Sequence, residues 1–219
     1  MGSIALTVLL SSLPFVAACQ TERGHEKADS TAATMGDLRT AVADLKQKVS
    51  ATAETLAVIV EKGSEDPKPG FERFTKNMKS LEDSVDKAEG MLKSMQSQGQ
   101  AYFAAWEKNS AAITNADLKK VSNERRASLA ASLDTISKAM DSSRAEYKPL
   151  MSSIKDAHTY LSSDLTPAGI KSIKDVAKSI GKSASTVNKH LDDVVEAINE
   201  SAPQFETAKP PPPAAEPKK

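Results

Sequence analysis

The sequence is poor in the residues that build thick cores and covalent cross-links. Its 219 residues include one cysteine, nine glycines and one tryptophan, and aromatic residues make up only 4%. A single cysteine excludes an internal disulfide, and so few large aromatic side chains argue against a thick globular core. The formal net charge is zero, because 29 Lys and Arg residues balance 29 Asp and Glu residues. A neutral chain is a poor match for a run of phosphates, so we expect no nucleic-acid partner.

Motifs of catalysis and cofactor binding are absent as well. The sequence has no Cys-x-x-Cys, no His-Glu-x-x-His, no phosphate-binding glycine-rich loop and no nucleophile elbow. Its three histidines, His25, His158 and His190, lie in separate segments and do not form the paired Glu-x-x-His motifs of di-iron bundles. We therefore predict a protein that is not an enzyme and that holds no cofactor and no metal.

An uncharged stretch precedes the only cysteine, Cys19. Residues 4–18 read I-A-L-T-V-L-L-S-S-L-P-F-V-A-A, which is too short to span a bilayer as a helix but fits the apolar core of a secretion signal. Small Ala17 and Ala18 directly before the cysteine suit the pocket of a signal peptidase. The run V-A-A-C resembles the lipobox of bacterial lipoproteins, in which the cysteine thiol receives a diacylglycerol and becomes the mature N-terminus.

This resemblance implies a signal peptide over residues 1–18, lipidation of Cys19 and a membrane contact through that lipid. Gln20 stands where an Asp often retains such lipoproteins at the inner membrane, so the outer membrane facing the periplasm is the implied location. Two alternatives stay open. Residues 1–3 contain neither Lys nor Arg, unlike most signal peptides, which leaves room for a start codon further upstream. Cys19 would otherwise be a buried cysteine in an ordinary apolar helix.

Helical periodicity begins after a predicted flexible tether at residues 19–33. Apolar residues then recur at alternating spacings of three and four, which is the pattern of one helix face. We predict helices at residues 34–62, 70–113, 115–162 and 167–200. Thr114 is placed to cap the third helix, and Thr166 with Pro167 is a start signal for the fourth.

Short connections make consecutive helices antiparallel neighbours. The predicted fold class is therefore all-α, an elongated up-down-up-down four-helix bundle or pair of coiled-coil hairpins over residues 34–202. Small side chains at many apolar positions predict a thin core. The third apolar stripe begins at Leu118 and Val121 and changes register before Leu129. Residues 203–219 are proline-rich and predict a disordered tail of polyproline II character.

The densest aromatic cluster is Y-F-A-A-W-E at residues 102–107. Trp106 lies on the apolar stripe and Phe103 lies beside it, so these two residues are candidate contacts with a partner. Packing within the core is the other explanation. The segment K-K-V-S-N-E-R-R at residues 119–126 is locally basic, so it is suited to anionic lipid headgroups or an acidic partner, or to a solvated helix face.

Several features together resemble an uncharacterised family of bacterial helical lipoproteins, a domain of unknown function. They are the lipobox, the long heptad helices, Y-F-A-A-W-E, N-E-R-R at residues 123–126 and S-S-D-L-T-P-A-G-I at residues 162–170. The resemblance covers residues 35–200 and implies fold and location only.

Two functional hypotheses follow from the sequence. One is a lipid-anchored structural or interaction protein that binds an envelope protein or the cell wall. The other is a carrier or membrane-active module whose helices open around lipid or an apolar ligand. A heptad stripe does not specify whether every partner helix belongs to the same chain, so the oligomeric state stays open.

Overall fold

The structure is a computed structural model that describes residues 24–62 and 66–206 of the chain. Its elements are α1 (Gly24–Lys62), α2 (Lys68–Ser110), α3 (Ala116–Ser163), α4 (Pro167–Ser172), α5 (Lys174–Ser201) and the short 3-10 helix η1 (Ala202–Gln204). No strand occurs within these described ranges. The predicted all-α fold class is therefore confirmed.

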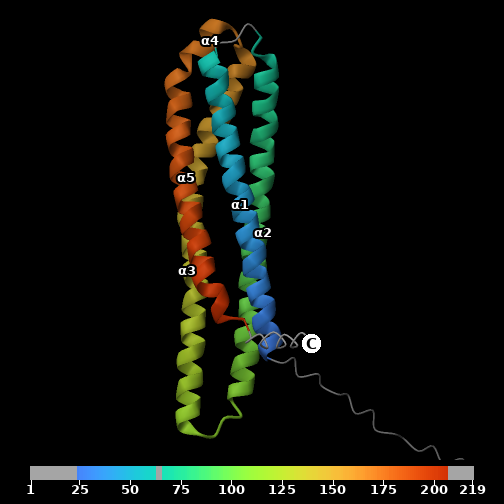
Figure 1. Cartoon of the computed structure of the whole chain (residues 1–219), viewed down its shortest axis with the longest axis vertical. Coiled ribbons are helices and arrows are strands. Elements are labelled where there is room, and N and C mark those ends of the chain that lie inside the picture. Colours follow the sequence, from blue (N-terminus) through green and yellow to red (C-terminus); the bar gives the residue numbers. More distant parts are fainter. Residues whose placement is uncertain (1–23, 63–65, 207–219) are drawn as a thin grey trace, which may run out of the picture.

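Four long helices lie side by side in an elongated antiparallel bundle (Figure 1). α1 packs against α2 and α5, while α3 packs against α5 and α2, so the helices surround one core. The short helix α4 lies at the end of the bundle where the chain passes from α3 to α5. Among the four neighbouring pairs, α2 and α3 approach each other least closely. The chain thus runs up, down, up and down, as predicted.

The core is one thin cluster that follows the length of the bundle. Its largest fully buried side chains include Phe74, Phe205, Met35, Leu38, Leu56, Leu81, Met95, Leu129 and Ile136. Between them stand small residues that let helices approach closely. Gly99 shows the need for a small residue, because a Cβ at this position would lie 2.2 Å from Leu133 Cδ1. Close backbone approach therefore replaces bulk over part of this core.

The first helix begins ten residues earlier than predicted. α1 starts at Gly24, so residues 24–33 are helical and not part of a flexible tether. Ala28 and Thr31 are buried and continue the stripe of Met35 at spacings of three and four. The Thr31 hydroxyl donates to the Lys27 carbonyl at 2.8 Å, which satisfies it inside the core. Ala28 is small and Thr31 is polar, so their spacing alone does not indicate an apolar helix face.

The end of the fold also differs from the prediction. Residues 203–219 were expected to form a tail, yet η1 extends the last helix and Phe205 is buried, with only 2% of its surface exposed. Pro203 fits inside η1 because the first turn of a helix does not need its missing N–H. The described chain therefore stays attached to the bundle up to Phe205, and residues 207–219 lie outside the described ranges.

Helix starts follow local hydrogen-bond chemistry. Thr166 caps α4 as predicted, since its hydroxyl accepts from the Gly169 N–H at 3.2 Å. The cap of α3 is Asn115 rather than the predicted Thr114, because the Asn115 side chain accepts from the Leu118 N–H at 3.0 Å. The predicted fourth helix is divided between α4 and α5 at Ile173.

Candidate functional site

The predicted aromatic cluster lies near the C-terminal end of α2. The ring of Tyr102 is buried and meets Phe103 at a centroid distance of 5.4 Å, Trp106 edge-on at 5.5 Å and Phe205 at 5.9 Å. Phe205 comes from the far end of the chain and was not predicted to belong here. Tyr102 thus joins α2 to the end of the fold through aromatic contacts.

The two candidate partner contacts are half-buried. Phe103 and Trp106 both pack against the core, and Trp106 Nε1 donates to Ser122 Oγ on α3 at 2.8 Å. This hydrogen bond fixes the indole between α2 and α3 and leaves part of its surface exposed. The structure therefore gives both residues a packing role and still leaves apolar surface at the bundle edge.

Beside this cluster lies an open hollow of about 400 Å³, here called the terminal hollow. Its wall is formed by Gly24, His25, Ala28, Tyr102, Trp106, Asn109, Ser110, Ile113, Ser122, Gln204, Phe205 and Glu206. The start of α1 and the last described residue, Glu206, thus meet at one site. Burial raises the pKa of Tyr102 above its usual value although Arg125 opposes the shift, so the phenol stays neutral at physiological pH.

α2 and α3 continue past the start of α1 and the end of α5 (Figure 1). In this part of the molecule no residue between 103 and 128 is buried. Leu118 and Val121 were predicted to start the core stripe of the third helix, but each keeps 61% of its surface exposed. The stripe is present, but within the described part of the chain no helix opposes it, because α1 and α5 stop short of it. We call residues 107–126 the protruding hairpin.

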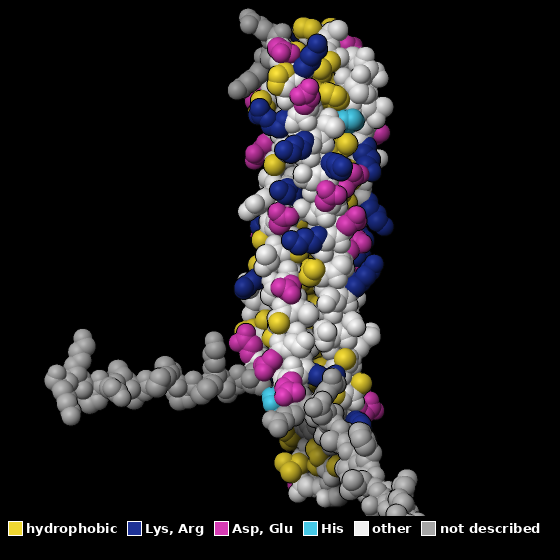
Figure 2. Space-filling view, turned by 90° about the vertical axis from the view of Figure 1, so that its right-hand side faces the viewer, with side chains coloured by type: hydrophobic (Ala, Val, Ile, Leu, Met, Phe, Trp, Pro, Cys, Tyr) yellow, Lys and Arg dark blue, Asp and Glu magenta, His cyan; other side chains and the backbone are white. Residues whose placement is uncertain are grey.

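A hydrogen bond joins the protruding hairpin to the bundle, and an ion pair joins the two arms of the hairpin. Arg125 donates to the Gln204 carbonyl at 2.8 Å, and Arg126 pairs with Glu107 across the hairpin at 3.5 Å. Figure 2 shows hydrophobic side chains at the lower end of the molecule, and others lie among the acidic and basic side chains further up. The hairpin is therefore a fixed extension with apolar surface at its end.

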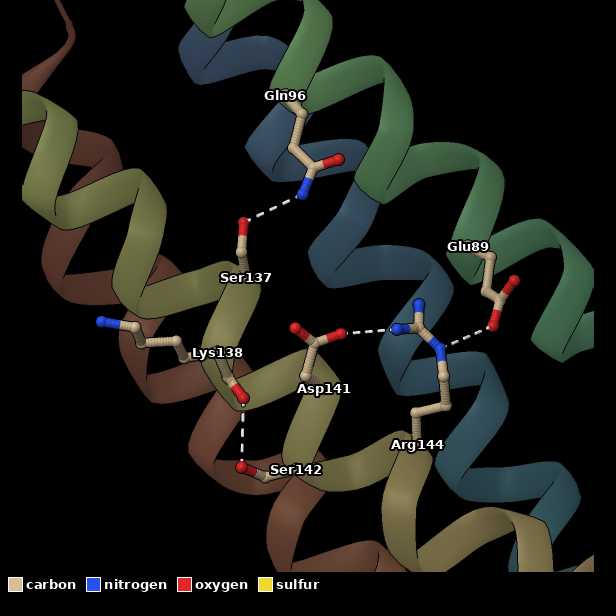
Figure 3. A network of polar contacts seen from close by, with 7 residues as sticks. All are labelled: Glu89, Gln96, Ser137, Lys138, Asp141, Ser142 and Arg144. Carbon is tan, nitrogen blue, oxygen red and sulfur yellow. Dashed lines mark hydrogen bonds and ion pairs between the residues drawn. The ribbon is translucent and has the colours of Figure 1, made fainter.

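A second feature is the interface between α2 and α3, which is bridged by polar side chains (Figure 3). Gln96 Nε2 donates to Ser137 Oγ at 3.1 Å, and Arg144 Nε donates to Glu89 Oε1 at 3.0 Å. Arg144 also bonds Asp141 on its own helix at 2.5 Å. We call this interface the polar seam. Polar bridging fits the wider spacing of these two helices.

The polar seam contains a small apolar groove. It has a volume of about 100 Å³ and is lined by Leu45, Val85, Ala88, Glu89, Met140, Ser143, Arg144, Tyr147 and Lys148. Leu45 belongs to α1, so the groove reaches the core between α2 and α3. Burial, together with the charges of Glu82, Asp86 and Glu89, raises the pKa of Tyr147 to about 12. The Tyr147 phenol is therefore neutral in this groove at physiological pH.

The histidines His158 and His190 each lie next to a local partner. His158 stacks on Phe71 at a centroid distance of 5.0 Å and bonds the Thr75 hydroxyl at 3.0 Å, while His190 lies 3.5 Å from Asp193. Within residues 24–62 and 66–206, no group of three or more His, Cys, Asp or Glu side chains is arranged to hold a metal ion. None of the helices in the same ranges combines the length and apolar character needed to cross a bilayer.

The predicted lipidation site, Cys19, lies outside the described residues. Four residues separate it from Gly24. Even a fully extended chain covers at most about 18 Å over this separation. A lipid on Cys19 would therefore be confined to the end of the bundle that carries the terminal hollow and the protruding hairpin.

Comparisons with known proteins identify a family for this chain. The model of a family described as "Protein of unknown function (DUF2959)" matches residues 17–207. No curated protein matches the chain, and neither does any solved structure. The matched range includes Cys19, all the described helices and Phe205.

Proposed function

Because the chain belongs to DUF2959, a family of unknown function, we propose a function from its own residues: a lipid-anchored, non-enzymatic helical protein of the bacterial cell envelope. In this proposal the bundle acts as a structural or protein-interaction module. Membership of an uncharacterised family was predicted and is confirmed, and the lipid anchor is part of the proposal. Binding to an envelope protein or to the cell wall would be its activity.

The anchor rests on the sequence before the bundle. An uncharged run of fifteen residues ends in two small residues directly before a single cysteine, which is the order in the lipobox that this stretch resembles. Gln20 favours the outer membrane, with the bundle in the periplasm. One acyl chain gives only weak membrane binding, so the two chains of a diacylglycerol suit a stable anchor.

The observation that carries the interaction role is the terminal hollow. It is open, it is lined by Tyr102, Trp106 and Phe205, and Phe103 is half-exposed beside it. Aromatic side chains with one polar group are enriched where proteins bind each other, because they bury a large area at little cost in side-chain entropy. A partner that inserts an apolar side chain here would displace water from a preformed apolar wall.

The anchor is tested by growing cells with an alkyne analogue of palmitate and fractionating their membranes. The native chain should carry the label and sediment with the outer membrane, and Cys19→Ala should lose both properties. A native chain that stays unlabelled and soluble would contradict the anchor. Circular dichroism of the variant must remain helical, so that misfolding does not imitate loss of the lipid.

The interaction role is tested by photocrosslinking in living cells. A photoreactive residue at Asn109, in the wall of the terminal hollow, should give a discrete crosslinked product. The same residue at Lys182, exposed on α5, is the matched control and should give none. Equal products from both positions, or only the uncrosslinked monomer from Asn109, would argue against a partner at the hollow.

The polar seam supports a second candidate function, a carrier or membrane-active module. Ion pairs such as Arg144 with Glu89 and Lys155 with Glu82 are partly exposed, so each contributes little to holding α2 and α3 together. The groove between these helices already reaches Leu45 in the core. Hydrogen exchange of α2 and α3 should accelerate with extracted lipid if the seam opens, and unchanged protection would exclude this function.

A further inference from the structure

The protruding hairpin exposes a helix face of core type. Leu118 precedes the fully buried Leu129 by eleven residues, which is three helical turns, so both lie on one face of α3. Arg125 lies on that face between them and reaches the Gln204 carbonyl at 2.8 Å. Cover by the bundle therefore ends at Arg125. Leu118 and its neighbour Val121 continue the apolar face, and no helix of residues 24–62 or 66–206 lies opposite them.

The same end of the molecule receives the proposed lipid. The wall of the terminal hollow includes both Gly24 and Ile113, so the start of α1 lies close to the hairpin loop. At most about 18 Å of extended chain joins Gly24 to Cys19. Figure 1 shows the hairpin extending beyond the start of α1 in the direction away from α4. A lipid on Cys19 therefore holds the membrane within reach of the hairpin.

The exposed face could be covered by a membrane surface or by residues 207–219 of this chain. The charges of the hairpin favour the membrane surface. Residues 107–126 contain five basic and three acidic residues. The pairs Arg126–Glu107 and Lys120–Glu124 are each neutral, so the excess positive charge comes from Lys108, Lys119 and Arg125 against Asp117. Residues 207–219 hold three lysines and one glutamate, so like charge disfavours their docking on the hairpin. Anionic phospholipid has the opposite charge and accepts apolar side chains.

We infer that the protruding hairpin is a second membrane contact, in which Leu118 and Val121 enter an anionic phospholipid surface flanked by Lys119 and Lys120. The inference rests on the proposed lipid anchor, which supplies a high effective concentration of membrane at the hairpin. Each basic residue near an anionic surface strengthens binding about fivefold, so weak contacts suffice once the chain is anchored. With the lipid and the hairpin both at one end, the long axis of the bundle points away from the membrane.

Fluorescence quenching of the lipidated protein tests this contact. The mature chain, purified with its lipid, is reconstituted into vesicles of phosphatidylethanolamine and phosphatidylglycerol that contain a headgroup spin-label quencher. An environment-sensitive fluorophore is placed on Leu118→Cys or on Val176→Cys. Val176 is a matched control because it is an apolar residue, 43% exposed, in the first turns of α5 near α4. The lipid occupies the thiol of Cys19, so the new cysteine is the only reactive one.

The expected result is blue-shifted, strongly quenched emission at position 118 and unquenched emission at position 176. Lys119→Glu with Lys120→Glu should remove the quenching, whereas Lys178→Glu with Lys182→Glu on α5 should leave it unchanged. Equal quenching at both positions would overturn the inference and leave the anchor intact. The inference would also be overturned if the fluorophore at position 118 showed the same blue-shifted emission without vesicles, because residues 207–219 would then cover this face.

The anchor has its own control in this experiment. The native chain should take up no fluorophore, and it should float with the vesicles. Uptake of the fluorophore at Cys19 by the native chain, which then fails to float, would overturn the proposed anchor and the inference with it. Circular dichroism of each variant must match that of the native chain.

Discussion

Phe205 is the residue whose removal tests the end of the fold most sharply. It lies beyond the last long helix, has 2% of its surface exposed and contacts Tyr102 at a centroid distance of 5.9 Å. Replacing a buried Phe by Ala costs about 3–5 kcal/mol. We expect Phe205→Ala to lower the free energy of unfolding by about 3 kcal/mol, the lower end of this range, because the chain end can relax into the terminal hollow.

Urea unfolding followed by circular dichroism gives this free energy directly. The sole tryptophan, Trp106, reports on the same site because its ring lies 5.5 Å from Tyr102, so its emission should shift to longer wavelength in Phe205→Ala. Phe103→Ala is the control within the cluster and should cost about 1 kcal/mol, since Phe103 is only half-buried. A loss below about 1 kcal/mol for Phe205→Ala, with unchanged Trp106 emission, would show that the chain end is not docked.

Three further predictions concern α-helix ends, packing and titration. Asn115→Ala should cost about 1 kcal/mol in urea unfolding and Thr114→Ala almost nothing, because Asn115 caps α3; the reverse order would restore Thr114 as the cap. Gly90→Ala should stabilise by about 0.5–1 kcal/mol through helix propensity, since nothing lies near the new methyl. Gly169→Ala should destabilise by about 1–3 kcal/mol, because its Cβ would lie 2.6 Å from a backbone oxygen; a gain in both melting temperatures would refute this contrast. The raised pKa of Tyr147, about 12, favours the neutral phenol in the folded state, so the stability that it contributes is present below pH 10 and is lost as the pH rises to about 12. In Tyr147→Phe the free energy of unfolding should fall less between pH 10 and about 12 than in the native chain. The same pH dependence in both proteins would contradict the raised pKa.

Helical periodicity predicted most of the fold because it depends on local spacing alone. Residues such as Leu38, Leu56 and Leu81 are large, regularly spaced and buried as expected. The same rule failed at Ala28 and Thr31, where the stripe continues in residues too small or polar to show it. It also failed at Phe205, because Pro203 indicated the end of helical structure. The burial of the Phe205 ring depends on Tyr102, about a hundred residues away in sequence, which local spacing does not reveal.

The candidate site was only partly predictable for a different reason. Leu118 lies on the helix face that its spacing predicts, yet its exposure depends on where α1 begins and α5 ends. Similarly, the pairing of Arg144 with Glu89 depends on the relative register of two helices, which spacing within each helix does not specify. Phe103 and Trp106 stand out in the sequence as part of an aromatic cluster, whereas the terminal hollow is formed by residues of α1, α2, α3 and the segment 204–206, which spacing does not place together.

The lipid anchor is tested most directly by the mass of the N-terminus. The protein is purified from its native membrane, digested, and its first peptide is analysed by mass spectrometry. The anchor predicts that the chain begins at Cys19, that residues 1–18 are missing and that the cysteine carries the mass of a diacylglycerol. A chain that retains residues 1–18 and an unmodified Cys19 would contradict the anchor, and with it the membrane contact proposed for the protruding hairpin.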